Sequence, residues 1–150
     1  MNYVALDDDK KTLMLLRLYK RLNKRLYNNS LTLPEIQIAD VLYTREKFST
    51  CWAGFKQHTN SFAFSRDIEK DFIEYRLSIE DQKRFLCAMM LHEMAHQYCF
   101  ANKIDDSYHC QEWQDVANSH GLELKYTDGV CEYERLSTLG IIATVNFRIY

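Results

Sequence analysis

The stretch that decides the fold is Ser78–Asn102, SIEDQKRFLCAMMLHEMAHQYCFAN. Its opening, Ser78-Ile79-Glu80-Asp81, has the form of a capping box, a hydroxyl followed three residues later by an acid, and this form is typical of a helix N-terminus. Apolar side chains and histidines then recur at steps of three and four residues, which predicts one helix ending near Asn102. These positions are Phe85, Met89, His92, His96 and Phe100.

This predicted helix carries the pattern His92-Glu93-Met94-Ala95-His96, or HExxH. Residues four apart on a helix share one face, with Cβ atoms about 5–6 Å apart. Two such imidazoles can both reach one Zn²⁺ ion at a Zn–N distance of about 2.0–2.1 Å. Glu93 then flanks the ion and could take the proton of an activated water and return it to a leaving amine. The pattern predicts a zinc centre with Glu93 as general base.

A catalytic zinc normally takes three protein ligands and leaves one position open. The metzincin extension is excluded, because it needs Gly at 99 and His at 102, where Cys99 and Asn102 stand. His109 follows His96 after a loop that can turn the chain back, and we expect it to be the third ligand. The alternatives that the spacing leaves open are Asp105, Asp106, Cys110 and Glu112.

The remaining patterns predict an α+β fold in one domain over residues 1–150. Helical periodicity indicates an N-terminal helix over 8–27 and a short helix over 110–119 that follows the HExxH helix and ends at His120-Gly121. Alternating apolar residues predict a small antiparallel sheet and a terminal strand, with a turn at Asp128-Gly129. The expected strands are 35–42, 51–57, 61–65, 72–77 and 141–150.

Composition excludes several classes of protein. The 150 residues are 47% hydrophobic with one proline and four glycines, which excludes a disordered or low-complexity chain. A run of about 18 apolar residues is missing, so we expect no transmembrane helix. The first residues lack the basic start and apolar stretch of a signal peptide. Five scattered cysteines without a Cys-x-x-Cys pair indicate free thiols, so we expect a cytoplasmic protein.

The net charge of −2 is unevenly distributed. Residues 1–30 hold seven cations against three aspartates, a balance of +4, which leaves −6 for the rest. A cationic side of the first helix could contact the phosphates of DNA, although such a run is more often a solvated helix face. It consists of Arg17, Lys20, Arg21, Lys24 and Arg25.

The order of these motifs resembles the SprT-like metalloprotease domain, the group that includes the Spartan proteases. The resemblance rests on Leu91–His96 followed by His109 and Trp113, and on three further stretches over about residues 13–122. These stretches are Leu18–Asn23, Leu31–Pro34 and Cys51–Phe55. It implies a zincin-like fold in which His92, His96 and His109 bind zinc, Glu93 is the general base, and the substrate is a protein or peptide, with DNA-associated proteins as one such class.

The sequence departs from the family pattern in two places. Cys110 stands where the family usually has Gly after the third histidine, and Cys131 alone cannot build the C-terminal zinc ribbon of many members. Residues 123–150 have no recognised counterpart and are interpreted as an extension. We therefore predict a zinc metallopeptidase. The alternatives are a non-catalytic zinc-containing module that binds DNA or protein, and a zinc hydrolase that acts on a non-peptide amide.

Overall fold

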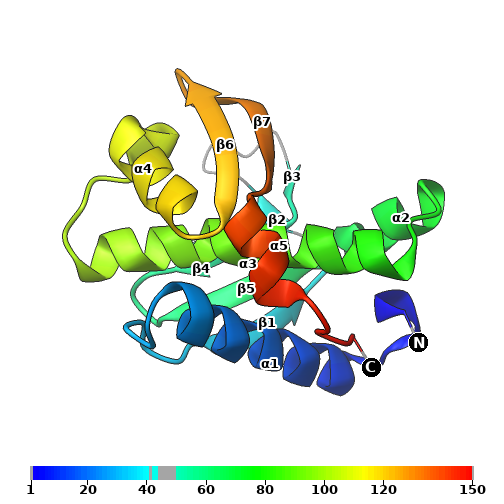
Figure 1. Cartoon of the computed structure of the whole chain (residues 1–150). Helices are drawn as coiled ribbons and strands as arrows, with labels where there is room; N and C mark the ends of the chain where they lie inside the picture. Colours follow the sequence, from blue (N-terminus) through cyan, green and yellow to red (C-terminus); the bar gives the residue numbers. More distant parts are fainter. Residues whose placement is uncertain (1, 41, 44–49, 150) are drawn as a thin grey trace.

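The computed structural model describes residues 2–40, 42–43 and 50–149 (Figure 1). Residue 41, within the strand expected near 35–42, and residue 150, at the end of the expected terminal strand, lie outside the described residues. In chain order the elements are the 3-10 helix η1 (Tyr3–Ala5), α1 (Asp8–Leu26), β1 (Glu35–Ala39), β2 (Leu42–Tyr43), β3 (Thr50–Cys51), β4 (Ala53–Lys56), β5 (Ser61–Ser65), α2 (Asp67–Glu74), α3 (Ile79–Ala101), the 3-10 helix η2 (Ser107–His109), α4 (Gln111–Ser119), β6 (Leu122–Thr127), β7 (Val130–Leu136) and α5 (Thr138–Thr144).

The main sheet has the strand order β1-β5-β4 and is mixed, not antiparallel as expected. β5 pairs parallel with β1 and antiparallel with β4. All five residues of β5 are buried, so this strand is stable only in the centre of the sheet, covered on both faces. A short turn connects β4 to β5, and β5 lies between β1 and β4.

Helix α1 confirms the N-terminal helix expected over 8–27. The Asp7 carboxylate accepts a hydrogen bond from the Lys10 N–H, and two further aspartates lie in the first turn, where anions stabilise a helix. One face of α1 is buried in the core through Met14, Leu15, Leu18 and Leu22. This face holds α1 against β1, α3 and α5.

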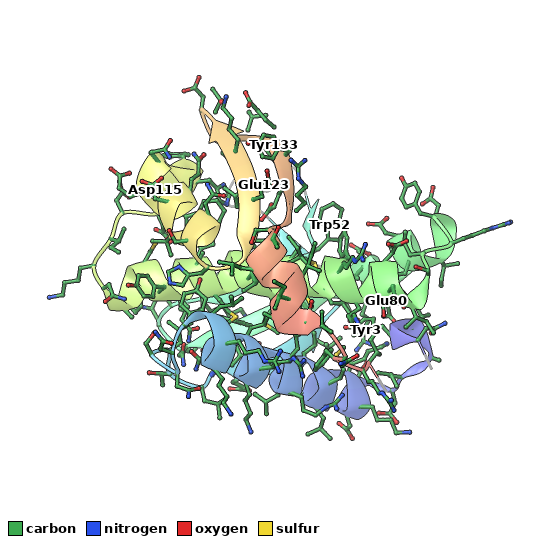
Figure 2. The ribbon with its side chains drawn as sticks, viewed as in Figure 1. Tyr3, Trp52, Glu80, Asp115, Glu123 and Tyr133 are labelled. Atoms are coloured by element: carbon green, nitrogen blue, oxygen red, sulfur yellow. The ribbon has the colours of Figure 1, made fainter. Side chains whose placement is uncertain are left out.

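Helix α3 runs through the middle of the molecule and contains residues 92–96. Ser78 is its N-cap, as the capping box predicts, and its Oγ accepts the Asp81 N–H at 3.1 Å. α3 packs on β4, α4, α5 and the β6–β7 hairpin. In Figure 1, α1 lies on one side of α3, and α4 and the hairpin lie on the other. Figure 2 marks these latter elements by Asp115 on α4 and Glu123 on β6.

The strand expected over 72–77 is wrong, because residues 67–74 form helix α2. Ile68 and Phe72, four residues apart, are buried, whereas Ile73 and Tyr75 of the alternating pattern are exposed. The alternation thus described solvent-facing residues, and the helical pair decided the local structure.

The strand expected over 141–150 is also wrong. Residues 138–144 form α5, whose N-cap Ser137 accepts the Gly140 N–H, and irregular chain follows. Ile141 and Val145, expected to face inward, are 41% and 49% exposed, and the buried residues of 141–149 are Ala143, Thr144, Phe147 and Ile149. A hydroxyl N-cap followed by Thr138-Leu139 outweighed the weak alternation.

Residues beyond 122 belong to the same core as the rest of the chain. Leu122, Leu124 and Leu136 of the hairpin and Phe147 after α5 join the buried cluster that α1 and α3 form. The four cysteines with described side chains, Cys87, Cys99, Cys110 and Cys131, are free thiols. Among the described residues, no helix combines the length and the apolar character that crossing a membrane requires.

Candidate metal centre

Three histidines from two parts of the chain meet beside α3. His92 and His96 extend from α3, and His109 ends η2, just before α4. Ring nitrogens of the three lie within 4.8 Å of one another, and Nε2 of His92 is 3.2 Å from Nε2 of His109. Nitrogens about 2.0–2.1 Å from one tetrahedral ion are roughly 3.3 Å apart. The donor set and its spacing therefore fit a single metal ion.

The backbone at His109 is strained in a way that aims this side chain. Tyr108 and His109 both have positive φ, 54° and 51°, a left-handed conformation that costs L-residues roughly 1–2 kcal/mol each. Gln114 of α4 holds the segment, because its Nε2 donates to the backbone oxygens of His109 and Tyr126. The Tyr126 N–H donates in return to Gln114 Oε1. His109 is thus fixed by α4 and β6 together.

A buried tryptophan forms the apolar floor of the cluster. Trp113 is completely buried. The centroid of its ring lies 4.8, 4.9 and 4.6 Å from the ring centroids of His92, His96 and His109. Tyr126 covers His109 from another direction at 4.4 Å. These rings limit water around the imidazoles, so electrostatic interactions in the cluster are stronger than in solvent.

Two carboxylates lie behind the histidines of α3. Glu134 Oε1 of β7 is 2.6 Å from His92 Nδ1, and Asp106 Oδ2 is 2.8 Å from His96 Nδ1. The second oxygen of Glu134 accepts a hydrogen bond from the Tyr126 hydroxyl at 2.8 Å. Both carboxylates thus contact the Nδ1 atoms.

Burial and neighbouring charges shift the protonation of these groups. Burial disfavours a charged His92, but the hydrogen bond with Glu134 and the nearby carboxylate of Glu93 raise its pKa on balance. His109 has the opposite shift, because burial and the adjacent His92 and His96 lower its pKa to about 4. Burial opposes the charge of Glu134, yet its bonds with His92 and Tyr126 hold its pKa below the usual value. His109 is therefore neutral and able to bind a cation at physiological pH.

Glu93 is buried on α3 next to His92. Its exposed fraction is 6%, and its Oε1 lies 3.9 Å from His92 Nε2. A carboxylate at this distance is not hydrogen-bonded to the imidazole. The Glu93 carboxylate therefore lies beside the three-histidine cluster without a hydrogen bond to His92.

A sequence model described as the SprT-like family matches residues 15–132, most of the chain. The chain belongs to the SprT-like family. The SprT-like match contains all three histidines, Glu93 and Tyr126, and it extends beyond residue 122, where the resemblance was expected to end. It stops two residues before Glu134. Membership is compatible with a metallopeptidase. Neither the curated proteins nor the solved structures contain a match to this chain.

The other candidate ligands of this SprT-like protein do not belong to the group of residues that could hold a metal ion. Glu112 is exposed on α4, and the Cys110 thiol donates to the Asp105 backbone oxygen. Asp105 accepts the Ser107 N–H, and Asp106 contacts the outer nitrogen of His96. Within the described part of the chain, the group that could hold a metal ion consists of the three histidines alone.

Sequence reasoning missed Glu134 and Tyr126. Glu134 is 42 residues from His92 and lies in the segment interpreted as an extension. Neither alternating set of residues in β7 is apolar, so no pattern shows which side faces the protein. Asp106 was considered only as a ligand, and its contact with His96 depends on a loop whose path the sequence does not specify.

Proposed function

We propose that this SprT-like protein is a zinc-dependent metallopeptidase that hydrolyses peptide bonds, with His92, His96 and His109 as the ligands. The observation that carries the proposal is the convergence of three imidazoles within 4.8 Å beside the buried carboxylate of Glu93. Imidazole nitrogens are preferred ligands of zinc, and three of them with one open position are typical of a catalytic site.

Zinc held by these three histidines would lower the pKa of a water to about 7 and polarise the scissile carbonyl. Glu93 would act as general base: its carboxylate would accept a proton from the attacking water and deliver it to the leaving amine. His92 and His96 share one face of α3, so the helix keeps their separation constant. Trp113 restricts water behind the ligands and strengthens the charge interactions of the reacting groups.

The alternative is a non-catalytic module in which zinc has a closed set of four protein ligands. The cluster offers three ligands from the described residues. Of the candidates for a fourth, Cys110 donates to the Asp105 backbone oxygen, and Asp106 contacts the outer nitrogen of His96. A set of three protein ligands is typical of a catalytic zinc and not of a closed structural site, and this supports the enzyme. A zinc hydrolase that acts on a non-peptide amide would use the same groups, so profiling with peptide and non-peptide amides distinguishes the two.

The substitution Glu93→Gln tests the proposal directly. The variant keeps the shape of the side chain but cannot take a proton, so we expect it to bind one zinc per chain and to lose at least about 100-fold in cleavage rate. Cleavage of an unfolded, fluorescently labelled protein and the bound metal are measured on the same sample. Glu112→Gln, on the exposed side of α4, is the control and should cleave at the normal rate. Undiminished cleavage by Glu93→Gln contradicts the assignment of the general base.

A further inference from the structure

Glu134 is a carboxylate on the face of the β6–β7 hairpin that otherwise joins the core. It pairs across the hairpin with Leu124, and directly opposed residues lie on the same face. Leu124 is 3% exposed, and the Glu134 side chain is 21% exposed. Burying a carboxylate costs free energy unless hydrogen bonds compensate it. The position would suit an apolar residue, so the carboxylate needs an explanation beyond packing.

Both oxygens of Glu134 have partners: one is a histidine of the cluster, and the other is a tyrosine that packs on the cluster. Oε1 is 2.6 Å from His92 Nδ1, and Oε2 accepts the Tyr126 hydroxyl at 2.8 Å. An ionised carboxylate can only accept hydrogen bonds, so Nδ1 of His92 must carry the proton. In the neutral imidazole this leaves the lone pair on Nε2, the nitrogen that faces His109.

The hairpin is shaped so that Tyr126 can support Glu134. The strand register shifts between Lys125 and Tyr126, so Tyr126 pairs with Cys131 while Leu124 pairs with Glu134. Such a bulge redirects a side chain locally and is a typical feature beside functional sites. Here the Tyr126 ring packs on His109 while its hydroxyl reaches Glu134.

We propose that Glu134 is a positioning residue of the metal centre, which fixes His92 with its proton on Nδ1 so that Nε2 faces the ion. The inference rests on the proposed metal centre. It also makes the hairpin, interpreted from the sequence as an extension of unknown role, part of that centre. Carboxylate partners of ligand histidines orient the ring and raise its basicity, and their loss typically lowers metal affinity about 10–100-fold.

A purely structural role must be separated from this one. If Glu134 only fastened the hairpin to α3, its removal would lower the melting temperature without lowering the zinc affinity. The zinc affinity therefore distinguishes the two roles. The cobalt-loaded protein reports the hydrogen bond itself, because ring N–H protons of ligand histidines give strongly shifted NMR signals. These signals persist in water only when a hydrogen bond protects the proton.

The experiment measures zinc affinity by competition with a chelator and the cobalt NMR spectrum for four proteins. Glu134→Ala should lose about 10–100-fold in zinc affinity and one shifted N–H signal. Glu134→Gln can still accept from Nδ1 but lacks the charge, so it should lie between Glu134→Ala and the unmodified protein. Glu132→Gln, on the same strand and 45% exposed, is the matched control and should match the unmodified protein in both measurements.

Unchanged zinc affinity and an unchanged set of N–H signals in Glu134→Ala overturn the inference. Should Glu134→Ala fail to fold, Glu134→Gln decides, since unmodified affinity in that variant also overturns it. Failure of the inference is distinguishable from failure of the proposed function. An unmodified protein that takes up no zinc overturns both, whereas normal zinc binding in all four proteins overturns the role of Glu134 alone.

Discussion

His109 points its Nε2 at Nε2 of His92 across 3.2 Å, although 17 residues separate the two along the chain. Two unprotonated ring nitrogens at this distance direct their lone pairs at each other, which is unfavourable unless a proton or a cation lies between them. The arrangement therefore fits a proton or a cation held between the two nitrogens, and His109 is the residue that brings the second nitrogen there.

Replacing His109 by Ala should abolish tight zinc binding. Two ligands of three remain, so the loss should exceed the about 100-fold that removal of a hydrogen-bond partner of a ligand costs. Metal content after dialysis and a chelator competition measure it. Glu112→Ala, three residues along the chain and exposed, should leave zinc binding unchanged. Equal metal content in His109→Ala and the unmodified protein would move the third ligand elsewhere.

Zinc affinity should rise with pH and then level off. Zinc binds the deprotonated imidazole, and the pKa of His92 is raised, so a proton on His92 competes with the ion below that pKa. The pKa of His109 is about 4, so its proton does not compete at neutral pH. Because one proton on His92 competes with the ion, the zinc affinity should fall up to about tenfold per pH unit below the pKa of His92. Competition titrations between about pH 8 and about pH 5.5 measure this slope.

The variant Glu134→Gln provides the control for this pH dependence. Without the carboxylate charge, the pKa of His92 should be lower, and the decline in affinity should begin at a lower pH. A zinc affinity that stays constant over the whole range in the unmodified protein would contradict competition by His92.

Gly140 allows α5 to lie directly on the turn before β6. A Cβ at Gly140 would be 2.1 Å from the backbone oxygen of Gly121, which cannot move as a flexible side chain could. Gly140→Ala should therefore lower the free energy of unfolding by about 1–3 kcal/mol or more. Thermal unfolding measures the change. Gly54→Ala is the control, because a Cβ there meets nothing within 4 Å and should leave the melting temperature nearly unchanged.

The arginines of the cationic side of α1 have partners in the C-terminal segment. Arg21 Nε donates to the Ala143 backbone oxygen at 2.8 Å, and its Nη2 donates to the Val145 oxygen. Arg21→Ala should therefore lower the free energy of unfolding by about 1 kcal/mol, measured by denaturant titration. Lys20→Ala, at the exposed preceding position, should leave stability unchanged. Equal stability of the two variants would contradict a structural role for Arg21.

DNA contact by α1 stays a prediction. If it exists, the exposed lysines of the cationic side contribute to it, and joint replacement of Lys20 and Lys24 by Ala should lower DNA affinity. It should also reduce the salt dependence of binding by about two phosphate contacts.

The strongest sequence predictions concern local structure with a clear physical period or cap. α1, α3, α4, β5 and the Asp128-Gly129 turn were predictable because each is specified by its own residues. The secondary structure of 72–77 and 141–150 was not predictable in this way. A short alternation of apolar residues favours a strand, but helix caps and (i, i+4) pairs of similar strength favour a helix over the same residues. The parallel pairing of β1 with β5 could not be read from either strand alone.

The sequence by itself determined that two histidines and a glutamate share one turn of a long helix, because helical spacing follows from the chain alone. It also indicated His109 as their partner. Only the tertiary structure decided which atoms meet: the left-handed turn that aims His109, and the hairpin that brings Glu134 and Tyr126 behind His92 from 42 residues away. Contacts between distant segments depend on how whole elements pack, and no local pattern of residues encodes that packing.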